Sequence, residues 1–522
     1  MILRAIGLLA AALALGGGAQ PERVDLIIRG GTIYTGEAAP FTGDVAVKGD
    51  RIRAVGPRLT YRATKVIDAQ GMIVAPGFID PHTHMGADLA SDDARTRLVP
   101  AFLMQGVTTA VIGNDGGGEP DVGTLLRRWR TKPVGINYAA FVGFGAVRSE
   151  VIGSDDRAPT PADLDRMKAL VATAMCDGAL GLSTGLFYAP QSFARIDEVV
   201  ALSREAGRRG GLYDSHIRDE SSYSIGLAAA VNEAIEIGRQ AGLPVNISHI
   251  KALGVDVHGQ APAIIARIEA AQAAGQRVTA DQYPWTASGT SLAAALVPRW
   301  AQDGGRPALL ARFDNVAMLP RLMGEMADNL RRRGGALALL ITEGPHRGKR
   351  LSQVAEERGS PDPVQTAIDI IRVADPAVAS FNQTEEDIAA FMARPWVMTG
   401  SDASAGHPRM FGSFARKYAE YVVRRRVLSL QDFIHRSTAL TADTFGIADR
   451  GRLRQGAFAD IVMFDPAAYA ERSTYEQPTE LAVGMRAVVV NGVLAVENGA
   501  LSGAAPGRGL EKTPTAGSCP RG

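Results

Sequence analysis

The feature that most constrains the fold is an eightfold alternation of short β runs with helical segments through the middle of the chain. Strand-like runs are expected at residues 73–83, 107–114, 135–142, 178–183, 211–216, 244–249, 277–283 and 396–401. Amphipathic segments separate them, for example 224–241, where apolar residues recur at helical spacing until Gly242. Eight such units predict an α/β fold of the (β/α)8 TIM-barrel type, and an open doubly wound sheet is the alternative.

The two ends of the chain show another pattern. Residues 24–74 contain short β runs separated by glycines, and β runs return at 456–465 and 487–496, the second with a hairpin turn at Asn491-Gly492. We therefore expect one small β domain, built from residues 22–75 and 450–500, beside a barrel of residues 76–449. Residues 501–522 are expected to form a C-terminal tail.

The N-terminus has the pattern of a secretory signal. Arg4 precedes an apolar run at residues 5–15, and small residues follow up to Ala19. This pattern predicts a signal peptide at 1–19 and export to the periplasm or medium, with a buried N-terminal helix as the alternative. Eleven apolar residues are too few to span a bilayer, so no stable membrane anchor is expected.

Composition excludes several classes of function. The 522 residues are 46% hydrophobic and 21% charged, with 56 basic against 55 acidic side chains. A net charge of +1 lacks the basic excess of a nucleic-acid-binding protein, and no run of like charge indicates a membrane-surface patch. The two cysteines, Cys176 and Cys519, can form neither a disulfide framework nor a thiolate zinc cluster. Any metal must therefore bind histidine and carboxylate.

Such side chains follow the predicted strands at their C-terminal ends, where the active sites of α/β barrels lie. The candidates are His82 and His84 after the first strand, Asp115 after the second, His216 and His249 after the fifth and sixth, and Asp402 after the eighth. Imidazole and carboxylate are good ligands for Zn²⁺ and similar ions. The sequence thus predicts a divalent metal centre at the mouth of the barrel.

The intervals between these residues fit a barrel. His84 and Asp115 lie 31 positions apart and His216 and His249 lie 33 apart, close to the roughly 31 residues of an average barrel unit. His249 and Asp402 are separated by 153 positions, where two units need only about 65. We expect an insertion at about residues 292–395, over the mouth of the site.

The chain resembles the amidohydrolase superfamily, and within it the N-acyl-D-amino-acid deacylases. The resemblance covers nearly the whole chain after the signal sequence, to about residue 498. It is carried by PGFIDPHTH (76–84), GALGLSTGLFYAP (178–190), SHIRDE (215–220), ISHIK (247–251), DQYPWTASGTSL (281–292), TGSDASAGHPR (399–409) and GIADRGRLRQGAFADIVMFDP (446–466). It implies a barrel with a small β-sandwich, and a metal-dependent hydrolase that releases a carboxylate and a D-amino acid from a small N-acyl amino acid.

The resemblance also implies roles for individual residues. His82 and His84 match the metal pair of the first strand, His216 and His249 match the histidines of the tighter metal site, and Asp402 matches the catalytic acid/base. Three further residues match the pocket for the substrate carboxylate, namely Lys251, Tyr283 and Arg409. One or two divalent ions are implied, zinc before manganese or cobalt.

Two positions depart from the family pattern. Asp115 stands where the family has a metal-binding cysteine, and a carboxylate is a harder ligand that favours ions such as Mn²⁺ or Co²⁺. Alternatively, Asp115 only caps the glycine loop at 116–118. Ser288-Gly289 replaces a usual Gly-Ser order, so Ser288, Thr290 and Ser291 are all candidates for the hydroxyl that binds the carboxylate.

Other functions stay open at this point. Within the superfamily these are another amidase, a cyclic amidase of the hydantoinase or dihydroorotase type, and a dipeptidase. Gly181-Leu-Ser-Thr-Gly185 also fits the nucleophile elbow of serine hydrolases, with Ser183 as nucleophile and His407 or His435 downstream. A non-enzymatic barrel with a degenerate site is the third alternative.

Overall fold

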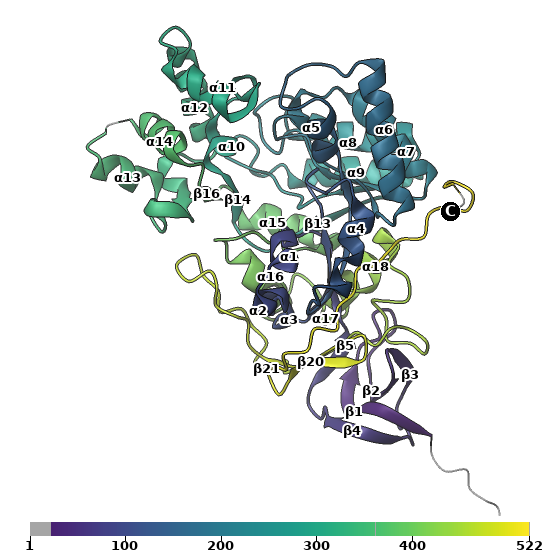
Figure 1. Cartoon of the computed structure of the whole chain (residues 1–522). Helices are drawn as coiled ribbons and strands as arrows, with labels where there is room; N and C mark the ends of the chain where they lie inside the picture. The colour runs from purple at the N-terminus through teal and green to yellow at the C-terminus, as the bar shows by residue number, and fades with distance from the viewer. Residues whose placement is uncertain (1–21, 361, 521–522) are drawn as a thin grey trace, which may run out of the picture.

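The computed structural model describes residues 22–360 and 362–520, so the predicted signal peptide at 1–19 lies outside the described residues. The described chain consists of a barrel, a sheet built from both chain ends and a mixed α/β insertion (Figure 1). In the described part of the chain, no helix is long and apolar enough to cross a membrane.

The barrel contains parallel strands at all eight predicted positions. These are β6 (Phe78–Asp80), β7 (Val107–Ile112), β8 (Asn137–Ala140) with its continuation β9 (Val142–Gly143), β10 (Gly181–Gly185), β11 (Leu212–His216), β12 (Val245–Ile247), β13 (Val278–Gln282) and β17 (Val397–Thr399). They are hydrogen-bonded in the orders β6-β7-β8 and β9-β10-β11-β12-β13-β17. A parallel bridge between Thr83 and Ala403 joins the first strand to the last, so the alternative of an open sheet is wrong.

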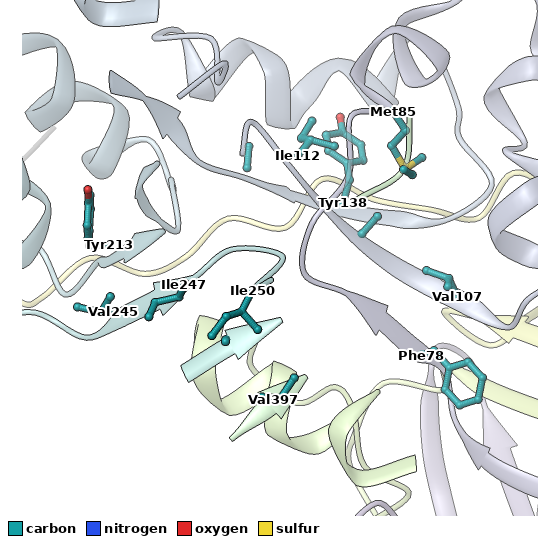
Figure 2. Close-up of a cluster of buried hydrophobic side chains, with 14 of the residues drawn as sticks. Phe78, Met85, Val107, Ile112, Tyr138, Tyr213, Val245, Ile247, Ile250 and Val397 are labelled. Atoms are coloured by element: carbon teal, nitrogen blue, oxygen red, sulfur yellow. The ribbon is translucent and has the colours of Figure 1, made fainter. Parts of the chain in front are cut away.

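The strands are buried on both faces, as parallel strands between helices must be. Figure 2 shows labelled core side chains from several of them, including Phe78 of β6, Tyr138 of β8 and Val397 of β17. Every residue of β7 (VTTAVI) and of β11 (LYDSH) is buried, polar side chains included, and His216 ends β11 at the mouth of the barrel. This architecture places the functional side chains at one edge.

Helices cover the outside of the barrel. They are α1 (Gly86–Ala90), α2 (Ala94–Arg97), α3 (Pro100–Leu103), α4 (Val122–Arg127), α5 (Phe144–Val151), α6 (Pro161–Cys176), α7 (Ile196–Arg208), α8 (Leu227–Ala241), α9 (Ala261–Ala273), α15 (Glu385–Met392), α16 (Arg409–Arg416), α17 (Leu430–Arg436) and α18 (Ala439–Phe445). Helix α8 begins three residues later than predicted, because Asp219 accepts the backbone N–H groups of Ser224 and Gly226. It ends as expected at Gly242, whose φ is 71°.

Both chain ends contribute to one continuous nine-stranded sheet. Its strands are β1 (Arg23–Ile33), β2 (Phe41–Lys48), β3 (Arg51–Gly56), β4 (Arg62–Asp68), β5 (Ile73–Pro76), β18 (Ile461–Phe464), β19 (Met485–Val490), β20 (Val493–Glu497) and β21 (Ala500–Leu501). Strand β5 pairs with β1 from the start of the chain and with β18 near its end. The predicted hairpin at Asn491-Gly492 is confirmed, with both residues at positive φ between β19 and β20.

The single run predicted at 73–83 is divided between two sheets, which corrects the expectation. Its first half is β5 of the end sheet and its second half is β6 of the barrel. Gly77 lies at the division, where a Cβ atom would come within 2.1 Å of Thr108 Oγ1. The change of sheet therefore needs glycine at this position.

The insertion lies between β13 and α15 and carries its own core. Its elements are β14 (Ala287–Ser291), α10 (Leu292–Leu296), α11 (Gly305–Asp314), α12 (Leu319–Arg332), β15 (Leu339–Ile341), α13 (Leu351–Glu357), α14 (Pro363–Val373) and β16 (Ala377–Phe381). The strands form an antiparallel sheet in the order β14-β16-β15. The insertion thus runs over 287–381 rather than 292–395, because α15 packs Phe391 into the barrel core.

The residues after β21 form a C-terminal strap (502–520) that runs over the barrel, yellow in Figure 1. Backbone N–H groups of the strap donate to carbonyls just before the starts of barrel strands, from Gly507 to Val134, from Lys512 to Gly178 and from Thr515 to Arg209. The two cysteines, which cannot form a framework of several bridges, form one disulfide, Cys176–Cys519. It fastens the strap to the end of α6.

Candidate active site

The candidate site is a cavity of about 360 Å³ at the C-terminal ends of the barrel strands. Barrel residues line one side of it, among them His84, Asp115 and Asp402, and insertion residues such as Thr342 and Val378 line the other. As expected from its place in the sequence, the insertion lies over the mouth of the barrel.

Three of the predicted site residues have an unusual backbone conformation. Asp115, His249 and Asp402 follow β7, β12 and β17, with φ angles of 56°, 36° and 49°. Non-glycine residues seldom adopt positive φ, and where they do the surroundings must hold them there. His249 N donates to Asp281 Oδ1 at 3.0 Å, and Asp402 N donates to the carbonyl of His82 at 2.9 Å. The chain therefore turns sharply at each strand end and directs these side chains into the mouth.

All four predicted histidines direct a ring nitrogen at the carboxylate of Asp115. Oδ1 lies 3.4 Å from His82 Nε2 and 3.5 Å from His249 Nε2, and Oδ2 lies 3.5 Å from His84 Nε2 and 3.6 Å from His216 Nδ1. Each carboxylate oxygen thus faces one histidine of the first strand and one of the later strands. This places Asp115 at the centre of the cluster.

The cluster fits a divalent metal. Asp115 Oδ1, His82 Nε2 and His216 Nδ1 are buried and have no hydrogen-bond partner among the described residues. Buried polar atoms are normally satisfied, so atoms that face one another without a partner indicate a ligand between them. His82, Asp115, His249 and Asp402 lie close enough together to offer ligand atoms to one ion, and imidazole and carboxylate are the donors that zinc and similar ions prefer.

Asp402 lies between the histidine cluster and a buried arginine. Its Oδ1 is 3.1 Å from His84 Nε2 and its Oδ2 is 2.6 Å from Arg409 Nη1. Burial alone would raise the pKa of Asp402, but the charges of Arg409 and His249 hold this pKa well below its usual value. Burial likewise opposes the charge of His84, whereas Asp115 and Asp402 raise the pKa of His84 to about 9.

The three residues predicted to bind a carboxylate lie together. Two cations lie close to the Tyr283 ring, with Arg409 Cζ 5.0 Å and Lys251 Nζ 5.7 Å from its centroid. All three side chains are buried and line the cavity. Ser288 lines it too, and its Oγ accepts from Asn382 Nδ2 at 3.0 Å. The result is a positively charged pocket beside Asp402.

The other two candidate hydroxyls also line the cavity but are engaged with neighbouring groups. Thr290 Oγ1 donates to the hydroxyl of Tyr188, and Ser291 Oγ accepts the N–H of Ala294 at the start of α10. Ser288 and Ser291 both have a hydroxyl hydrogen left to donate, since each accepts from its neighbour, whereas Thr290 uses its hydrogen on Tyr188.

Glu220 is a site residue that the sequence analysis did not single out. It is buried and lies 2.5 Å from Lys251 Nζ, 3.2 Å from His249 Nδ1 and 3.7 Å from His216 Nε2. The available signal was an acidic residue four positions after His216, inside the motif SHIRDE. This carboxylate connects the histidine cluster to the carboxylate pocket.

The structure does not assemble the serine-hydrolase alternative. Ser183 is buried inside β10, where its Oγ donates to the carbonyl of Gly113 and accepts from Gly116 N. His407 bonds to backbone groups of Ala287 and Arg409, and His435 bonds to the carbonyl of Gly36. A nucleophile elbow needs a serine on a sharp strand–helix turn with histidine in reach. Ser183 instead supports the loop that carries Asp115.

Comparison with known proteins agrees with this site. The model of the amidohydrolase family matches residues 65–496. A D-aminoacylase of Alcaligenes xylosoxydans xylosoxydans is 34% identical over 94% of this chain and 98% of its own length. An N-acyl-D-aspartate deacylase of the same organism is 32% identical over 90% of this chain and 92% of its own.

Solved structures give the same result. A D-aminoacylase with a binuclear metal centre superposes with a TM-score of 0.80 and 31% identity, covering 94% of this chain and all of that one. The N-acyl-D-glutamate deacylase of Bordetella bronchiseptica, solved with zinc and a phosphonate mimic of the tetrahedral intermediate, gives the same values. The chain therefore belongs to the amidohydrolase family, among its N-acyl-D-amino-acid deacylases.

Proposed function

We propose that this protein is a metal-dependent deacylase, which hydrolyses the amide bond of N-acyl-D-amino acids to a carboxylate and a D-amino acid. The observation that carries the proposal is the place of Asp402, which contacts the histidine cluster through Oδ1 and the carboxylate pocket through Oδ2. The D configuration is supported by the relatives, which are a D-aminoacylase and deacylases of N-acyl-D-aspartate and N-acyl-D-glutamate.

The geometry of an N-acyl amino acid matches this arrangement. Its amide nitrogen and its carboxylate carbon are both bonded to Cα, which places them about 2.5 Å apart. A carboxylate bound by Arg409 and Lys251 over the Tyr283 ring therefore brings the amide nitrogen next to Asp402. The acyl carbonyl on the other side of that nitrogen is directed toward the histidine cluster. One substrate thus spans both halves of the cavity.

Each group of residues has a defined role. His82, His84, Asp115, His216, His249 and Asp402 would hold one or two divalent ions, zinc first of all. A bound ion would polarise the acyl carbonyl and acidify a water molecule. Asp402 accepts the proton of the attacking water and delivers it to the leaving nitrogen. Arg409, Lys251, Tyr283 and Ser288 bind the carboxylate and hold the amide bond in place.

The decisive experiment uses the purified protein after metal removal and reconstitution. We expect hydrolysis of N-acetyl-D-amino acids after addition of Zn²⁺, Mn²⁺ or Co²⁺, loss of activity with a chelator, and much slower hydrolysis of the N-acetyl-L-amino acids. Hydantoins, dihydroorotate and dipeptides serve as competing substrates. Preferred turnover of any of these, or activity that persists in the metal-free protein, would overturn the proposal.

We further propose that the enzyme works outside the cytoplasm, in the periplasm or the medium. Two observations support this, the signal-like sequence at 1–19 and the Cys176–Cys519 disulfide, since disulfides persist mainly in oxidising compartments. Mass spectrometry of periplasmic extracts should find a mature chain that begins at Gln20 and carries no free thiol. An intact N-terminus with two free thiols in the cytoplasmic fraction would contradict it.

A further inference from the structure

Glu220 lies behind two of the metal-site histidines, on a firmly held loop. The loop after β11 is fixed by Asp219, which accepts the N–H groups of Ser221, Ser224 and Gly226. The carbonyl of Glu220 accepts the N–H of Leu253, which ties this loop to the one after β12. Its side chain is only 6% exposed. The carboxylate therefore has a defined position relative to both loops.

The two histidines face the cluster through different ring nitrogens. His216 directs Nδ1 at Asp115 and leaves Nε2 on its outer side, whereas His249 directs Nε2 at Asp115 and leaves Nδ1 outside. The two oxygens of Glu220 are placed to match, with Oε2 at 3.7 Å from His216 Nε2 and Oε1 at 3.2 Å from His249 Nδ1. One carboxylate thus spans the outer nitrogens of both rings.

This arrangement suits histidines that bind a metal. When one nitrogen of a neutral imidazole binds an ion, the other carries the proton and needs an acceptor. Lys251 Nζ also lies 2.7 Å from His249 Nδ1, but an ammonium donates only and cannot accept from a ring N–H. Glu220 Oε1 can accept from both of them. With His249 bound to an ion, Lys251 keeps Glu220 as its partner and has further N–H donors free for a substrate carboxylate.

We propose that Glu220 is a positioning residue, which fixes His216 and His249 in the tautomers that bind metal and holds Lys251 ready for the substrate. Only the role of Lys251 in binding the substrate rests on the proposed function, because metal binding by His216 and His249 does not require the deacylase reaction. This arrangement makes Glu220 the link between the metal centre and the carboxylate pocket, because His249 and Lys251 both contact its buried carboxylate.

The test is the metal affinity of Glu220→Gln, measured by competition with a chromophoric chelator in the absence of substrate. Glutamine has the same shape, but its amide group presents a donor to one ring in place of an acceptor. We expect Zn²⁺ and Co²⁺ to bind about 10- to 100-fold more weakly, as is typical when an outer partner of a ligand is lost. The visible absorption bands of the Co²⁺ form should shift, since they report the geometry around the ion.

Two matched variants control the experiment. Glu233→Gln removes the partner of Arg218 on the same side of the barrel, without contact with the rings, and should keep the wild-type affinity and Co²⁺ spectrum. Lys251→Met should also keep the affinity, while the KM for N-acetyl-D-amino acids rises. Wild-type affinity and spectrum in a folded Glu220→Gln protein would overturn the proposal. An equal loss of metal in Lys251→Met would also overturn it, because the ion pair would then be the cause.

Discussion

Replacement of Asp115 by alanine should weaken metal binding more than any other single change in the loop after β7. Both carboxylate oxygens face two imidazoles each, at 3.4–3.6 Å, so ions bound on either side lose a ligand. A four-ligand zinc site is worth roughly 10–16 kcal/mol, or about 3 kcal/mol per ligand. At 1.4 kcal/mol for each factor of ten, Asp115→Ala should raise the Kd for Zn²⁺ by about 100-fold.

The fold should tolerate this change, because other groups hold the loop. Gly116 N donates to Ser183 Oγ, Gly117 N donates to the carbonyl of Asn114, and the backbone carbonyl of Asp115 accepts from Gln191 Nε2. A capping role for the Asp115 side chain is thus not needed. Thermal unfolding of the metal-free protein should change little.

The assay is metal content by mass spectrometry, together with activity profiles over Zn²⁺, Mn²⁺ and Co²⁺. Asp115→Cys should retain a site but shift its preference toward Zn²⁺, since thiolate is a softer ligand than carboxylate. Asp121→Ala is the control, an aspartate that caps α4 through Thr124 N. If Asp115→Ala keeps the wild-type metal content and all profiles coincide, the ligand assignment is wrong.

Three further predictions follow from the site and the strap. Asp402→Asn should lower kcat by about 10²–10⁴, the usual range for a general acid/base, and a near-normal kcat in single-turnover kinetics would exclude it as the proton carrier. Arg409→Met should raise KM about 10²- to 10⁴-fold for free carboxylates, at about 1.5–3 kcal/mol for each of two charged hydrogen bonds, but far less for the matching amides. An equal rise in KM for both kinds of substrate would show that Arg409 does not bind the carboxylate. Cys519→Ser should cost about 2–4 kcal/mol of stability; reductant should lower the Tm of the wild type to that of the variant, and a variant with the wild-type Tm would refute it.

The strand ends were predictable because their chemistry is local. His82 and His84 share one face of a β run, and Asp115, His216, His249 and Asp402 each stand at the C-terminal end of a predicted strand, so a barrel brings them together whatever the details of packing. Glu220 was not predictable in this way. It lies in a loop without periodicity, and its role arises only where that loop meets the loop of Leu253.

Two features of the fold could not be predicted from the sequence, for a related reason. Residues 73–79 contain no polar side chain and both β5 and β6 are buried, so the sequence pattern does not mark the change of sheet at Gly77. The pairing of Cys176 with Cys519 joins positions 343 residues apart, and spacing gives no information about such contacts. Both features depend on contacts between distant segments, which local propensity does not encode.

The placement of both chain ends has a consequence for how the polypeptide is made. Strand β5 can pair with β18 only after the ribosome has passed residue 464. Cys176 can form its disulfide only after Cys519, near the end of the chain, has been synthesised. At about 5–20 residues per second, synthesis leaves β5 without β18, and Cys176 without Cys519, for roughly 20–80 s. During this time the nascent chain exposes unpaired strand edges, to which a chaperone can bind. Such a chain is also not yet fully folded, and a polypeptide must be unfolded to cross a membrane through a narrow channel.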